Sequence, residues 1–165
     1  MSIKLNTEHI IRFLKDENLH SYVRNLSKEK YIQNERTLQA YIWNHMRSCF
    51  LKKRPNNKNL YFQDYFIDVE GFDGKTKTYP DLSVKHKFTH DMFFVIELKH
   101  YSENYNVTSE MLVEMKKDIT KLNNNPCPGA LVFTCPSENH YETALIELNN
   151  LKAVDTSIIT ILCEG

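Results

Sequence analysis

The sequence predicts an α/β domain in which a mixed β-sheet is flanked by helices. Apolar residues first recur at helical spacing, and the pattern then changes to short runs of aromatic and β-branched residues. After the third such run, helical and strand-like segments alternate, which favours parallel strands joined through helices. With 165 residues, 41% of them hydrophobic, the chain can form one compact domain with a substantial core.

Charge and composition exclude several classes of protein. Lys and Arg together number 21, as do Asp and Glu, so the formal net charge is zero. A protein held to nucleic acid or membrane by bulk charge alone is therefore excluded. The N-terminus lacks the apolar core of a signal peptide, and no apolar run approaches the roughly 18 residues that cross a bilayer. We expect a cytoplasmic protein with no membrane partner.

The first fifty residues predict two helices. Thr7 is an N-cap residue type for a helix from Thr7 to Leu26, in which apolar residues recur every three or four positions. A second helix is expected from Lys28 to Leu51. Basic residues followed by Pro55 mark its end, because cations suit a helix C-terminus and proline stops propagation.

Three strands are expected next. Residues Leu60–Val69 are rich in aromatic and β-branched side chains, Tyr79–His86 alternates in polarity, and Asp73-Gly74 between them is a hairpin signal. The run Met92–Lys99 is mostly apolar, which is typical of a central strand buried on both faces. Short links make these three strands antiparallel neighbours.

The remaining segments alternate helix and strand. Thr108 is an N-cap residue type for a helix that ends at Asn123–Pro126. Further along we expect a strand at Ala130–Thr134, a helix from Ser137 to Leu148, and a strand at Ser157–Leu162. The passage from the third strand to the fourth through a helix predicts a right-handed crossover between parallel strands.

Two charged residues interrupt the apolar third strand. Glu97 and Lys99 are two positions apart, so both side chains project to the same face. Buried charges cost several kcal/mol unless they are paired or bound to a cation. A mutual ion pair at a strand end would explain them, with Asp81 as a solvated turn residue.

Strand register adds a third charged residue to this pair. The link between the second and third strands centres near Thr89, which places Asp81 opposite Glu97. Like charges at directly opposed positions, about 5 Å apart at Cβ, destabilise a sheet. A divalent cation bridging the two carboxylates turns that repulsion into a set of ligands. The opposed acids therefore favour a metal site over a simple ion pair.

A glutamate also interrupts the apolar stripe of the second helix. On a helical wheel, Glu35 lies within 60° of Leu38 and 20° of Ile42, and Gln39 follows one turn later. Taken alone, Glu35 is explained as a flank residue that turns to solvent. Together with the two acids of the strands, it becomes a candidate metal ligand or water-holding residue.

These residues resemble the motif of the PD-(D/E)XK nuclease superfamily, which has the restriction-endonuclease-like fold. The motif here is Pro80-Asp81, then fifteen residues, then Glu97-Leu98-Lys99. The resemblance implies an αβββαβ core with a mixed sheet flanked by helices, covering residues 28–135. Residues 1–26 would add an N-terminal helix and residues 136–165 a helix and a strand, all in one domain.

The resemblance further implies a nuclease that hydrolyses DNA phosphodiester bonds with Mg²⁺ or Mn²⁺. Asp81, Glu97 and the Leu98 backbone carbonyl would hold the metal. Glu35 would support this metal or a second one. Lys99 would orient and help deprotonate the attacking water while neutralising charge on the phosphate. Beside the bound cation and partly desolvated, its pKa is expected to be lowered, as a general base requires.

Basic residues on the helix after the third strand are candidates for binding nucleic acid. We expect Lys116, Lys117 and Lys121, together with Gln39, to contact the substrate, because phosphate contacts dominate affinity for nucleic acid. A solvated helix face explains the three lysines equally well.

A second functional hypothesis comes from the absence of net charge. It is a catalytically inactive protein of the same fold that binds nucleic acid or a protein. A subunit that needs a homodimer or another chain for cleavage is a third, because a single domain lacks a separate DNA-reading module.

Overall fold

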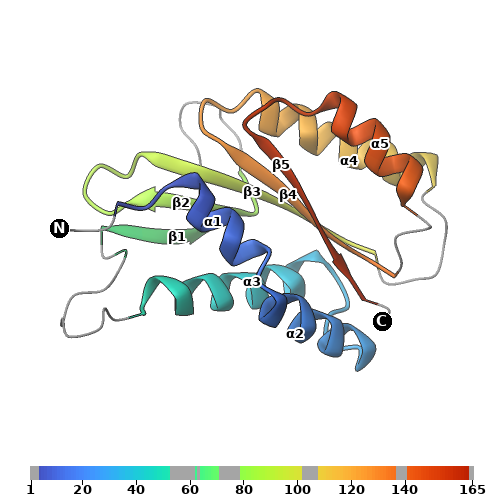
Figure 1. Cartoon of the computed structure of the whole chain (residues 1–165), viewed down its shortest axis with the longest axis horizontal. Coiled ribbons are helices and arrows are strands. Elements are labelled where there is room, and N and C mark those ends of the chain that lie inside the picture. The colour runs from blue at the N-terminus through green and yellow to red at the C-terminus, as the bar shows by residue number, and fades with distance from the viewer. Residues whose placement is uncertain are drawn as a thin grey trace.

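A computed structural model of the chain describes residues 4–52, 62, 64–70, 79–101, 108–136 and 141–163. Within them a five-stranded sheet has the order β1-β2-β3-β4-β5 (Figure 1). The helices are α1 (Thr7–Leu14), α2 (Glu17–Lys28), α3 (Glu35–Phe50), α4 (Ser109–Asn123) and α5 (Glu142–Leu151). The strands are β1 (Tyr65–Val69), β2 (Leu82–His86), β3 (Met92–His100), β4 (Gly129–Cys135) and β5 (Thr156–Leu162).

The sheet separates two layers of helices. Helices α1, α2 and α3 pack on one face, and α4 and α5 lie side by side on the other (Figure 1). Alternate residues of β3 serve the two cores: Phe94, Ile96 and Leu98 join the core under α3, whereas Val95 joins the core under α4. Glu97 and Lys99 follow the alternation of Val95, so their side chains belong to the α4 face.

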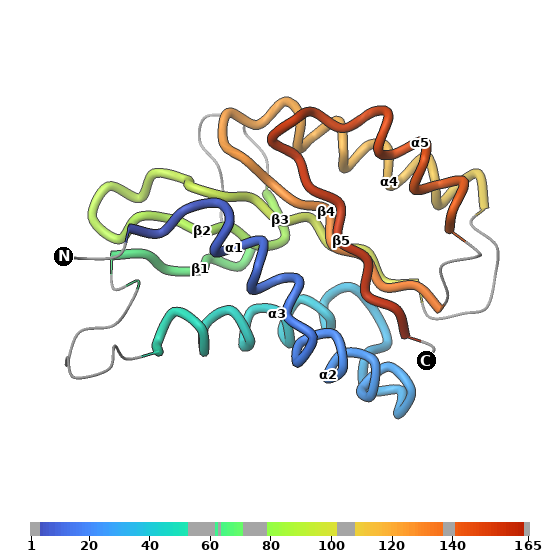
Figure 2. Tube along the Cα trace, viewed as in Figure 1, coloured from blue at the N-terminus to red at the C-terminus, as the bar shows by residue number. Residues whose placement is uncertain are grey.

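Strand directions confirm the predicted mixed sheet. β1, β2 and β3 are antiparallel neighbours, whereas β3, β4 and β5 run parallel. Figure 2 shows the chain passing from β3 through α4 to β4, and from β4 through α5 to β5. The order α3-β1-β2-β3-α4-β4 therefore has the predicted sequence of one helix, three strands, one helix and one strand.

The prediction of one helix from Thr7 to Leu26 is wrong, because the structure has two helices there. α1 ends at Leu14, and Asp16 then caps α2 by accepting a hydrogen bond from the Asn18 backbone N–H at 2.9 Å. Apolar side chains of both helices enter the same core, so the apolar pattern continues across the break. The N-cap of α1 is Asn6 rather than Thr7.

The second helix begins seven residues later than predicted, at Glu35 instead of Lys28. Asn34 caps it by accepting a hydrogen bond from the backbone N–H of Thr37 at 3.0 Å. Glu35 thus occupies the first turn, where a carboxylate is stabilised by the positive end of the helix dipole.

Strand limits differ from the prediction mainly at their starts. β1 begins at Tyr65 and β2 at Leu82, so Asp81 lies one residue before its strand. The last helix begins at Glu142, and its N-cap, Tyr141, makes no side-chain capping bond. The hairpin signal Asp73-Gly74 and the expected cap Ser137 lie outside the described residues.

None of the described helices combines the length and the apolar character needed to cross a lipid bilayer.

A glycine at the start of β4 allows α4 to pack closely on the sheet. A Cβ at position 129 would lie 2.7 Å from Leu122 Cδ2 and 2.9 Å from the backbone oxygen of Val95. The leucine can adjust, but the carbonyl of the neighbouring strand is fixed by the sheet. Gly129 is therefore required for the strand that follows the α4 crossover.

We predict that Gly129→Ala lowers the free energy of unfolding by about 1 to 3 kcal/mol, the usual cost of overpacking a core. Thermal unfolding should show a loss of several degrees, at roughly 2 to 4 °C per kcal/mol for a chain of this size. Ser157→Ala, on the half-buried face of β5, adds no atoms and is the matched control. A melting temperature of Gly129→Ala equal to that of the control would contradict this close packing of α4 on the sheet.

Candidate active site

Charged side chains from both helical layers converge where β2 starts and β3 ends. Asp81 precedes β2, Glu97 and Lys99 lie in β3, and Glu35 begins α3. The structure brings these four predicted residues together, and α4 adds Asp118 and Lys121.

Register confirms that Asp81 lies opposite Glu97. Leu82 pairs with Ile96 in this antiparallel pair of strands. Asp81, the residue before Leu82, therefore faces Glu97, the residue after Ile96. Asp81 Oδ2 accepts a hydrogen bond from the Leu98 backbone N–H at 2.7 Å. One carboxylate oxygen is thereby tied to β3, which fixes the orientation of the Asp81 side chain.

Gln39 holds the backbone of the same aspartate. Its Nε2 donates a hydrogen bond to the Asp81 backbone oxygen at 2.6 Å, and the Glu70 backbone N–H donates to that oxygen at 3.1 Å. Gln39 is only 6% exposed. The structure therefore gives it a positioning contact inside the protein, whereas the sequence predicted a contact with nucleic acid.

Glu97 is a buried acid with an ammonium partner. It is 4% exposed, and its Oε1 lies 2.6 Å from the Nζ of Lys121. Burial raises the pKa of Glu97 to about 8; Lys121 opposes this shift, and the neighbouring Asp81 carboxylate adds to it. The pKa of Glu97 therefore depends on the charges of the groups beside it.

Lys99 is held between two carboxylates from opposite helical layers. Its Nζ lies 3.3 Å from Glu35 Oε1 and 3.2 Å from Asp118 Oδ2. Burial disfavours the ammonium form, but Asp118 and Glu35 outweigh it and hold the pKa of Lys99 well above its usual range. In the metal-free protein the two acids therefore shift the pKa of Lys99 in the direction opposite to the one expected beside a bound cation.

Asp118 is the site residue that sequence reasoning missed. Its pKa is raised by burial, and the Lys99 ammonium opposes that rise. On α4, Asp118 is three residues after Met115 and four before Leu122, both buried in the core under this helix. Glu35 was identified because it is an acid that interrupts the apolar stripe of its helix. Asp118 has the same position relative to the apolar stripe of α4, so the same criterion would have identified it.

The donor atoms at this site fit a hard divalent cation. Within the described parts of the chain, no three His, Cys, Asp or Glu side chains converge closely enough to form a metal site by themselves. Mg²⁺ is commonly bound through one or two carboxylates, with waters and substrate phosphates as the other ligands. A cationic group is already held here by oxygen atoms alone, since Lys121 Nζ contacts Glu97 Oε1 and, at 3.3 Å, the Tyr79 backbone oxygen.

Two of the predicted nucleic-acid contacts lie elsewhere on α4. Lys116 forms an ion pair with Glu147 of α5. Lys117 is exposed and lies 3.4 Å from Glu114, one turn earlier on its own helix. Neither lysine contacts the charged cluster, which leaves Lys121 as the lysine of this group that does.

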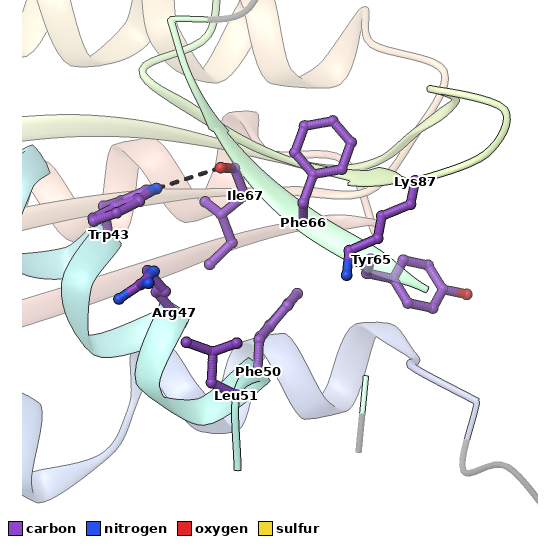
Figure 3. Close-up of a pocket in the computed structure, with 8 residues that line it drawn as sticks. All are labelled: Trp43, Arg47, Phe50, Leu51, Tyr65, Phe66, Ile67 and Lys87. Carbon is purple, nitrogen blue, oxygen red and sulfur yellow. Dashed lines mark hydrogen bonds between the residues drawn. The ribbon is translucent and has the colours of Figure 1, made fainter. Parts of the chain in front are cut away.

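A separate pocket lies between α3 and β1 (Figure 3). Trp43 donates a hydrogen bond from Nε1 to the Ile67 backbone oxygen at 3.3 Å, and the Arg47 guanidinium lies over the Trp43 ring. Among the described residues that line this pocket there is no carboxylate, and none of them belongs to the charged cluster.

Comparison with protein-family models, with curated proteins and with solved structures finds no match. A functional assignment of this chain therefore depends on the geometry and chemistry of the site itself.

We predict that Lys99→Met destabilises the protein in a pH-dependent way. The pKa values of Glu35 and Asp118 are already raised in the folded state, and loss of the ammonium raises them further. When the pKa of a carboxyl group is higher in the folded than in the unfolded protein, the folded state becomes less stable as the pH rises, because the group ionises more readily after unfolding. For Lys99→Met we expect the free energy of unfolding to change little near pH 4 and to fall by about 1 to 3 kcal/mol at pH 8. The loss is smaller than that for breaking a fully buried ion pair, because Glu35 is half-exposed and solvent screens its charge.

Thermal or urea unfolding between pH 4 and pH 8 measures this difference. Lys117→Met is the matched control, because Lys117 is exposed and pairs with Glu114 on its own helix, so its loss should stay within about 0.5 kcal/mol at every pH. An effect of Lys99→Met that is equal at both pH values would mean that the two acids do not depend on this ammonium group.

Proposed function

We propose that this chain is a metal-dependent nuclease of the PD-(D/E)XK type, which hydrolyses phosphodiester bonds in DNA. The observation that carries the proposal is the pair Asp81 and Glu97, opposed on neighbouring strands, with Lys99 on the same face of β3. The sequence of one helix, three antiparallel strands, one helix and a parallel strand supports a restriction-endonuclease-like fold.

Asp81 and Glu97, with the Leu98 backbone carbonyl, would hold Mg²⁺ or Mn²⁺. Bound there, the metal would act as a Lewis acid and lower the pKa of a bound water for in-line attack at phosphorus. The hydrogen bond from Leu98 to Asp81 and that from Gln39 to the Asp81 backbone keep this first ligand in place before metal binds.

Lys99 enters the reaction as a cation in this proposal. Its ammonium group would donate to a phosphate oxygen and offset the negative charge that develops there. Glu35 and Asp118 favour this ammonium form, so in this proposal the proton of the attacking water would pass to bulk solvent rather than to Lys99. Glu35 contacts Lys99, so we assign it to the positioning of this group.

A second candidate function is a non-catalytic module that binds nucleic acid or a protein. The observation that favours it is the pairing inside the cluster, since Glu97 and Lys121, and Glu35, Lys99 and Asp118, already compensate one another. The formal net charge of zero agrees with this alternative. An obligate partner subunit or a homodimer is a further form of the same proposal.

Cleavage of plasmid and linear DNA with Mg²⁺ or Mn²⁺ tests the nuclease. We expect Asp81→Ala and Lys99→Ala each to reduce the cleavage rate by at least about 100-fold, the usual effect of removing one group that stabilises the transition state. Lys117→Ala, on the exposed face of α4, should cleave like the unmodified protein.

Folding of each variant is checked by its thermal unfolding in the same buffer. Cleavage by both Asp81→Ala and Lys99→Ala at the rate of the unmodified protein would remove the assignment. Absence of cleavage together with metal-independent DNA binding would support the non-catalytic module.

A further inference from the structure

The Lys121 ammonium contacts Glu97, one of the two carboxylates that would hold the metal under the proposed function. Its Nζ is 2.6 Å from Glu97 Oε1 and 3.3 Å from the Tyr79 backbone oxygen, two residues before Asp81. These are oxygen partners of the kind that Mg²⁺ prefers. A second cation cannot approach the same carboxylate oxygen without repelling the ammonium group.

The two lysines of the cluster are held very differently. Lys99 lies between two carboxylates and has a largely buried side chain. Lys121 has one carboxylate partner and one carbonyl, and 32% of its side chain is exposed. If one ammonium group leaves when a metal arrives, Lys121 gives up one carboxylate partner where Lys99 would give up two, and its side chain is already partly exposed to solvent.

A divalent cation can be added to the cluster without an excess of positive charge. Four carboxylates and two ammonium groups, when all are ionised, carry two negative charges in excess, which one divalent cation offsets. Competition for Glu97 Oε1 would then leave Lys121 without a carboxylate partner. A long, flexible ammonium side chain beside a bound cation is then available to an anionic group of the substrate.

We propose that Lys121 is an internal counter-ion of Glu97 that gives way to the divalent cation and then binds a phosphate of the nucleic acid. The inference depends on the proposed function, because it assumes that Asp81 and Glu97 bind the metal. It makes Lys121 a positioning residue in the metal-free protein and a substrate-binding residue in the loaded one.

Calorimetric titration with Mg²⁺ at pH 8.5, without nucleic acid, tests the first half. We expect Lys121→Gln to bind Mg²⁺ about 5- to 10-fold more tightly than the unmodified protein, because the competing cation is gone. Lys121→Arg, which keeps the charge, should not gain affinity. Lys117→Gln is the control for loss of one positive charge from α4.

The same titration separates the two proposals. If neither the unmodified protein nor Lys121→Gln binds Mg²⁺, or if Asp81→Asn leaves binding unchanged, the proposed function fails. If binding occurs and is lost in Asp81→Asn, but Lys121→Gln gains no affinity, the proposed function stands and the counter-ion inference is overturned.

Salt dependence of binding to a short DNA duplex tests the second half. With Ca²⁺ present, Lys121→Gln should reduce the slope of log affinity against log salt by about one, the expected loss of one phosphate contact. In EDTA the slope should stay the same, because Lys121 is then bound to Glu97. Equal changes of slope in Ca²⁺ and in EDTA would overturn the proposed switch of partners.

Discussion

The opposition of Asp81 and Glu97 across β2 and β3 is the constraint on which the rest of the site depends. Two carboxylates at directly opposed positions repel each other, and Glu97 is almost completely buried. The fold compensates with cations: Lys121 of α4 pairs with Glu97, and Lys99 of β3 is held between α3 and α4. Helices on both faces of the sheet thus meet at one charged cluster. Under the proposed function, a divalent cation would take over part of this compensation.

The sequence predicted the sheet and this opposed pair for a simple physical reason. β2 and β3 are joined by a short turn, so counting outward from the turn fixes which residues face each other. Beside the turn Lys85 faces Met92, one residue away from that count, and the bulge between Val84 and Lys85 then shifts the register so that Leu82 faces Ile96, as the count expects. Helix limits were harder to predict. Asp16 and Asn34 begin new helices by capping them with their side chains. The spacing of apolar residues, on which the predicted helix limits were based, does not reveal such caps.

Long-range contacts explain what the sequence could not predict. The charge state of Lys99 depends on Asp118, which is distant in sequence and reaches the lysine only through the packing of α4 on the sheet. Gln39 was visible beside Glu35 on α3, but its hydrogen bond to the Asp81 backbone depends on how α3 approaches β2. Residue types could therefore identify candidates, whereas their roles depend on which helices meet at the strand ends.

A crystal structure of the protein with Mn²⁺ tests the central claim most directly, because anomalous scattering locates the ion and the same map shows the side chains around it. We expect one Mn²⁺ coordinated by Asp81 and Glu97, with the Lys121 ammonium moved away from Glu97. The claim would be contradicted if these two carboxylates stayed paired only with protein groups at saturating Mn²⁺, or if they lay on separate surfaces of the molecule.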